Sequence, residues 1–75
     1  MVTVYSKPGC QPCRMTKRAL DQRGIPYMAY DITENHDAFA AVESLGYREL
    51  PVVLDGDDHW SGFRPDKLAA LGDGE

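Results

Sequence analysis

Two patterns of hydrophobic residues alternate along the chain. Short runs of β-branched and aromatic residues, bounded by turn residues, are typical of strands. Longer segments in which apolar residues recur every three or four positions indicate amphipathic helices. The strands are predicted at 2–5, 27–32, 51–54 and 59–61. The helices are predicted over 11–23, between the capping residues 33–35 and Gly46, and from Pro65 to the stop at Gly72.

Each helix has one apolar face that we expect to point into the protein. The spacing assigns Met15, Ala19 and Leu20 to that face in the first helix. The same argument selects Ala38, Phe39, Val42 and Leu45 in the second helix, and Leu68 and Leu71 in the third.

The order β-α-β-α-β-β-α defines the fold class. Helices between the early strands favour parallel crossovers, whereas the short turn at 55–58 forces the last two strands to be antiparallel. The sequence therefore predicts an α/β protein with a four-stranded mixed sheet and three helices on its two faces. Seventy-five residues allow a single domain, 1–75, in which 72–75 is expected to be a frayed tail.

Charge and composition exclude several classes of function. The net charge of −4 and the lack of basic runs interleaved with aromatics argue against nucleic-acid binding. No apolar run is long enough to span a membrane, and the N-terminus does not resemble a secretory signal. We therefore expect a cytoplasmic protein, in which two cysteines stay largely reduced and a merely structural disulfide is disfavoured.

The charge is distributed unevenly. Positions 7–23 contain five basic residues and one acidic residue, Asp21. This segment is either a solvated helix face or a source of positive potential beside the cysteines.

Cys10-Gln11-Pro12-Cys13 is the strongest candidate for a reactive site. The motif follows a strand and opens a helix, as in thioredoxin-like redox proteins. Residues three apart on a helix share a face at a spacing that suits a disulfide. Unpaired amides at the helix start favour the thiolate of Cys10 and lower its pKa, and Lys7 could add to this. Cys13 lies further inside the helix and is expected to act as the resolving thiol.

Two other interpretations of the cysteines stay open at this point. They could be inert core thiols, or they could bind a metal. A structural zinc site needs four ligands, and only His36 and His59 remain besides the carboxylates. We expect no bound metal or cofactor, only a reversible Cys10–Cys13 disulfide.

Two further segments are candidates for partner binding. A proline that opens a strand is usually trans, but a cis Leu50-Pro51 bond would leave the backbone of residue 50 free to pair with an extended partner. In the stretch from Trp60 through Ser61, Gly62 and Phe63, the aromatic rings are either core residues or anchors for a partner.

Together, the Cys10-Gln11-Pro12-Cys13, Leu50-Pro51-Val52-Val53 and Trp60-Ser61-Gly62-Phe63-Arg64-Pro65 segments resemble the NrdH-redoxins. The resemblance extends from Val2 to about Leu71. It implies a thioredoxin fold in which Pro51 is cis, Cys10 attacks and Cys13 resolves. It also implies that the segment 60–65 braces the loop after the last strand.

The resemblance implies partners as well. Such proteins take electrons from NADPH through thioredoxin reductase and pass them to the large subunit of a class Ib ribonucleotide reductase. We expect the protein to act as a monomer. The main alternative is a glutathione-dependent glutaredoxin, although Ser61-Gly62-Phe63 lacks the glycine pair and acidic residue of a glutathione site. Two further alternatives are a metal- or cluster-binding module and a non-catalytic binding domain.

Overall fold

The computed structural model describes residues 2–71. Their element order is the predicted β-α-β-α-β-β-α, and the boundaries differ from the predictions by only a few residues. The elements are β1 (Val2–Ser6), α1 (Gln11–Gln22), β2 (Tyr27–Asp31), α2 (His36–Leu45), β3 (Val52–Asp55), β4 (Asp58–Ser61) and α3 (Pro65–Ala70). The tail predicted to be frayed, 72–75, lies outside the described residues.

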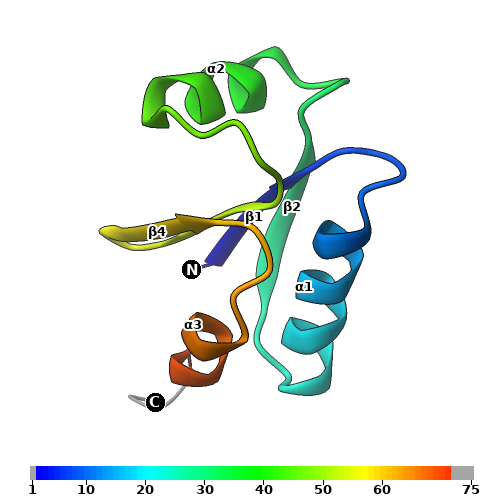
Figure 1. Cartoon of the computed structure of the whole chain (residues 1–75), viewed down its shortest axis with the longest axis vertical. Helices are drawn as coiled ribbons and strands as arrows, with labels where there is room; N and C mark the ends of the chain where they lie inside the picture. Colours follow the sequence, from blue (N-terminus) through cyan, green and yellow to red (C-terminus); the bar gives the residue numbers. More distant parts are fainter. Residues whose placement is uncertain (1, 72–75) are drawn as a thin grey trace.

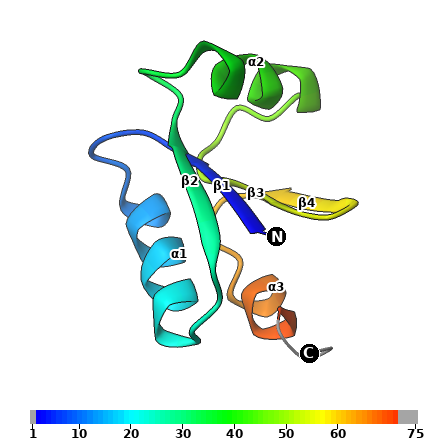
Figure 2. The ribbon, with the colours of Figure 1, turned by 180° about the vertical axis from the view of Figure 1, so that it is seen from behind.

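The four strands form one mixed sheet in the order β2-β1-β3-β4. β1 pairs with β2 in parallel and with β3 in antiparallel orientation, and β3 and β4 form a hairpin. A helix connects the parallel pair because that connection must cross from one end of the sheet to the other. α1 and α3 cover one face of the sheet, while α2 covers the opposite face (Figure 1). The same arrangement is visible from behind in Figure 2. The predicted fold class is confirmed.

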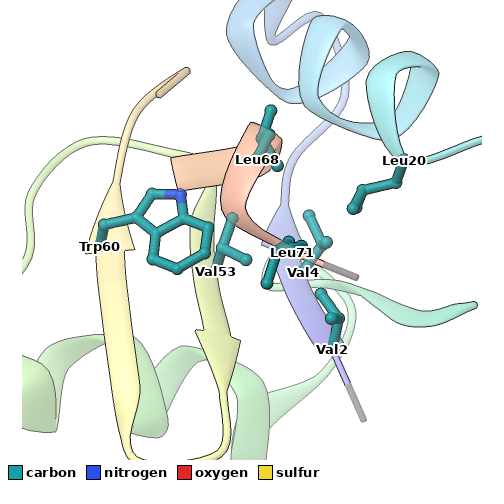
Figure 3. Close-up of a cluster of buried hydrophobic side chains, with 7 residues drawn as sticks. All are labelled: Val2, Val4, Leu20, Val53, Trp60, Leu68 and Leu71. Carbon is teal, nitrogen blue, oxygen red and sulfur yellow. The ribbon is translucent and has the colours of Figure 1, made fainter. Parts of the chain in front are cut away.

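The main hydrophobic core lies between the sheet and the pair α1 and α3 (Figure 3). Alternate residues of β1 point into it because successive side chains of a strand face opposite sides of the sheet. The core consists of Val2, Val4, Leu20, Val53, Trp60, Leu68 and Leu71.

The structure corrects the predicted inward face of α1. Met15 is 45% exposed, and the buried residues of the helix are Cys13, Thr16 and Leu20. These three positions follow one another at three- and four-residue spacing, so they form a single stripe. Met15 lies on the far side of the helix from that stripe. The hydrophobic pattern misplaced the face because it gave no weight to the buried threonine.

A similar correction applies to α2. Ala38 and Val42, four residues apart, are buried, whereas Phe39 is 46% exposed. Phe39 lies about 100° further round the helix than Ala38, which turns its ring to the edge of the buried face.

None of the helices within residues 2–71 combines the length and the apolar character needed to cross a membrane.

Candidate active site

A tight turn at the end of β1 delivers Cys10 to the start of α1. Gly9 has a φ of +73°, a conformation that side chains rarely adopt, and it reverses the chain between strand and helix. Cys10 is the N-cap of α1, with extended backbone angles. Pro12 occupies the first turn, where its missing N–H leaves no hydrogen bond unmade. The sequence thus places the cysteine motif at a helix N-terminus by local rules alone.

Cys10 and Cys13 are joined by a disulfide, with their Cα atoms 5.2 Å apart. The backbone N–H of Cys13 donates a hydrogen bond to Cys10 Sγ at 3.2 Å, so that this sulfur takes the place of an ordinary N-cap oxygen. Cys13 Sγ occupies no capping position. The two sulfurs therefore differ in their hydrogen bonding: Cys10 Sγ accepts from an amide of the first helical turn, which has no acceptor within the helix. The attacking role of Cys10 and the resolving role of Cys13 stay predictions.

Burial also distinguishes the two cysteines. Cys13 is 1% exposed and Cys10 is 6% exposed. Both cysteines are thus buried, and the Leu50-Pro51 loop lies against Cys10. Only a small part of Cys10 is therefore accessible to a reacting sulfur.

The loop before β3 lies beside Cys10. The Leu50 carbonyl oxygen lies 3.7 Å from Cys10 Sγ, although the two residues are forty positions apart in the sequence. The Leu50-Pro51 bond is cis, as the family resemblance implied, and Pro51 is buried. The structure thus brings together Cys10, Cys13 and the Leu50-Pro51 segment.

Ser61 and Gly62 hold this loop in place. Ser61 Oγ donates a hydrogen bond to the Glu49 carbonyl at 2.9 Å, and the Gly62 N–H donates one to the Pro51 carbonyl at 2.8 Å. Gly62 has a φ of +84°, which favours glycine at this position. Ser61, at the end of β4, and Gly62 therefore brace the loop before β3 that faces Cys10. The resemblance implied instead that this segment braces the loop after the last strand. The backbone role of Glu49 carries no sequence signal, since any residue supplies a carbonyl.

The two aromatic residues of this segment have different environments. Trp60 is 4% exposed and belongs to the core, which excludes it as a surface anchor for a partner (Figure 3). Lys67 Nζ lies 5.8 Å from the centroid of its ring. Phe63 is half-buried and packs against the core, so part of its ring stays accessible.

Lys7 is exposed on the loop between β1 and Cys10. It lines a shallow hollow with Lys17 and Asp31 on the side of β2. Hydrogen bonds from the Thr33 hydroxyl and amide lower the pKa of the Asp31 carboxyl, and Lys17 adds to this effect. The role of Lys7 in stabilising the Cys10 thiolate stays a prediction.

Residues 2–71 contain no cluster of three or more histidine, cysteine and acidic side chains that could hold a metal ion. The two histidines are exposed, and His59 Nδ1 is in hydrogen-bond contact with the Tyr47 hydroxyl at 2.8 Å.

Comparisons with known proteins agree with this site. The glutaredoxin family model matches residues 2–60. The glutaredoxin-like protein NrdH of Escherichia coli K12 is 40% identical over 70 residues, which covers 93% of this chain and 86% of the relative. The NrdH protein of Lactococcus lactis subsp. cremoris MG1363 is 41% identical over 71 residues, covering 95% and 99%.

Solved structures give the same result. The NrdH-redoxin of Escherichia coli superimposes with a TM-score of 0.89 at 40% identity, over 93% of this chain and 92% of the other. A buckwheat glutaredoxin in complex with glutathione reaches 0.72 at 28% identity, over 91% and 72%. With its cysteine pair at disulfide distance on a thioredoxin-like fold, the chain belongs to the glutaredoxin family of thiol–disulfide oxidoreductases and, within it, to the NrdH glutaredoxin-like proteins.

Proposed function

We propose that this protein carries electrons from NADPH and thioredoxin reductase to the large subunit of a class Ib ribonucleotide reductase. The observation that carries the proposal is the Cys13 N–H at 3.2 Å from Cys10 Sγ, which favours a thiolate at one sulfur only. The Escherichia coli relative is described as having a thioredoxin-like activity profile, which supports thioredoxin reductase as the electron source.

The reaction transfers two electrons through one mixed disulfide. The Cys10 thiolate attacks one sulfur of the partner disulfide, the S–S bond of the partner breaks, and its other sulfur leaves as a thiolate that takes a proton from water. Cys13 then loses its proton to water and attacks Cys10 Sγ. The mixed disulfide breaks, the second partner sulfur leaves and is protonated, and the Cys10–Cys13 disulfide remains. The partner has gained two electrons and two protons. This protein, which began as one thiolate and one thiol, has lost two electrons and one proton, and water supplies the other proton.

The Leu50-Pro51 loop gives this reaction a docking edge. None of the hydrogen bonds within residues 2–71 uses the Leu50 N–H, so this amide is free to donate a hydrogen bond to an extended partner. Its carbonyl already lies beside Cys10 Sγ. A partner segment that pairs with Leu50 by strand addition would present its own sulfur to Cys10. Ser61 and Gly62 support this edge from behind, and Phe63 completes the binding surface.

The alternative electron source is glutathione, as in the buckwheat glutaredoxin complex that shares the fold. A coupled assay separates the two. The oxidised protein is incubated either with NADPH and thioredoxin reductase, or with glutathione, NADPH and glutathione reductase, and NADPH consumption is followed. We expect rapid reduction of the protein, with one NADPH consumed per disulfide, only with thioredoxin reductase. Equal or faster reduction with glutathione would overturn the proposed electron source.

Two serine variants test the division of roles between the cysteines. We expect Cys10→Ser to abolish disulfide reduction, because no nucleophile remains at the helix start. We expect Cys13→Ser to form a mixed disulfide with the large subunit that accumulates, because it cannot be resolved, and that mass spectrometry detects. Loss of all disulfide reactivity in both variants would contradict the mechanism. A separate reconstitution tests the electron acceptor. When the ribonucleotide reductase is mixed with wild-type protein, thioredoxin reductase and NADPH, we expect it to form deoxyribonucleotides.

A further inference from the structure

The solvent-facing side of α1 carries a basic stripe that begins at the disulfide. Gln11, Arg14, Met15 and Arg18 line a shallow hollow of about 260 Å³. Their spacing of three and four residues places them on one face of the helix. All four are exposed, and their face lies on the other side of the helix from the buried stripe of Cys13, Thr16 and Leu20. Gln11 directly follows Cys10, so the basic stripe starts beside the reactive sulfur and runs about 10 Å along the helix axis.

The positive charge of the basic stripe is not neutralised within the described chain. The ion pairs among residues 2–71 join Arg64 to Asp66 and Lys67 to Asp58, and neither involves an arginine of α1. Arg14 and Arg18 are both exposed. With five basic residues and one acidic residue, the segment 7–23 carries a charge of +4, whereas the rest of the chain has three basic and eleven acidic residues and carries −8.

An apolar side chain lies between the two arginines. Met15 is 45% exposed and takes no part in the core, contrary to the hydrophobic pattern of the helix. Methionine adapts its shape to different apolar surfaces and is common in binding sites for variable sequences. The basic stripe therefore combines two exposed guanidinium groups with one flexible apolar contact.

We propose that the basic stripe docks an acidic, extended segment of the redox partner, the same segment that carries the partner's disulfide. This inference rests on the proposed function and adds the chemistry of the partner. Guanidinium groups pair with carboxylates in fixed, two-point geometry, and an apolar partner residue packs on Met15. A length of about 10 Å matches roughly three residues of extended chain. Because the rest of the protein is acidic, an acidic segment is repelled elsewhere and directed to this face.

Three synthetic peptides test the proposal. Each is an octapeptide with one internal disulfide, and the flanking residues are acidic, neutral or basic. The readout is the second-order rate constant for reduction of each peptide by the reduced protein at low ionic strength. The ratio of the acidic to the neutral rate constant divides out any change in the thiol itself. For the wild-type protein we expect an acidic-to-neutral ratio of about ten, which falls towards one at high salt. We also expect the basic peptide to react more slowly than the neutral one.

Charge reversal locates the effect. We expect Arg14→Glu and Arg18→Glu each to lower the ratio to about three or less. The matched control is Arg23→Glu, which makes the same change in net charge at the end of the same helix but lies beyond the hollow, and it should leave the ratio near the wild-type value. An equal loss in Arg23→Glu would show a global charge effect and overturn the docking site.

Failure of the docking site and failure of the proposed function give different results. A neutral peptide that is reduced normally, with an acidic to neutral ratio of one, overturns the docking site alone. No reduction of any of the three peptides overturns the proposed redox function and the docking site with it.

Discussion

Thr16 offers a direct test of how the active-site helix is packed. Its side chain is 0% exposed, and Oγ1 has no hydrogen-bond partner among the described residues. Thr16 lies in the buried stripe of α1 between Cys13 and Leu20. Valine has the same branched shape with a methyl group in place of the hydroxyl, so Thr16→Val removes the unsatisfied group without opening a cavity.

The expected magnitude follows from the cost of burying an unpaired hydroxyl. That cost is about 1–3 kcal/mol, so Thr16→Val should raise the free energy of unfolding by about 1–2 kcal/mol. For a domain of this size, each kcal/mol shifts Tm by about 4–8 °C, which predicts an increase of roughly 4–16 °C. Thr16→Ser keeps the hydroxyl and deletes a buried methyl group, and it should destabilise the protein by about 1 kcal/mol.

The assay is urea unfolding of the oxidised protein, followed by circular dichroism, with wild type and the two variants compared at the same pH. A Thr16→Val protein that is less stable than wild type, or equal to it, would refute the reasoning, because the hydroxyl would then have a partner. Repeating the measurement on the reduced protein has a second use. If valine stabilises the oxidised form more than the reduced form, the reduction potential of the protein must fall. If it stabilises the reduced form more, the potential must rise.

Three further predictions concern the residues around the site. Lys7→Ala should slow alkylation of the nucleophilic thiol by iodoacetamide at neutral pH, and an unchanged rate would remove Lys7 from the site. Gly62→Ala should lower the free energy of unfolding by about 1 kcal/mol, since φ is +84° there, and should also slow disulfide reduction. The control Gly56→Ala, at φ +61° in the β3–β4 hairpin, should cost similar stability but leave the reduction rate unchanged; equal slowing in both would argue against the bracing role of Gly62. Because its hydrogen bonds with Thr33 lower the pKa of the Asp31 carboxyl, the stability that they contribute is complete above the unfolded-chain pKa of about 3.9 and is lost as the pH falls through the folded value. Thr33→Ala should therefore make unfolding less dependent on pH between about 5 and 3, and an unchanged profile would contradict this assignment.

The sequence by itself determined the element order and the position of the reactive cysteines. These features depend on patterns that extend over only a few residues: runs of strand-forming residues, the helical spacing of apolar residues, and the glycines and prolines at element boundaries. Such patterns can be recognised in the sequence without knowledge of the fold. Cys10 and Pro12 mark the start of α1 by the same local rules. The family resemblance supplied the cis Pro51, for which residue statistics alone favour the trans form.

The tertiary structure alone decided which side chains are buried and which distant segments meet. Met15 and Phe39 are nearly half exposed and Trp60 is in the core, because burial depends on where the sheet lies against each helix and not on apolar character alone. The approach of the Leu50 carbonyl to Cys10 Sγ joins residues forty positions apart. No local preference encodes such a contact, since it results from the pairing of β1 with β3 and from the support of Ser61 behind the loop.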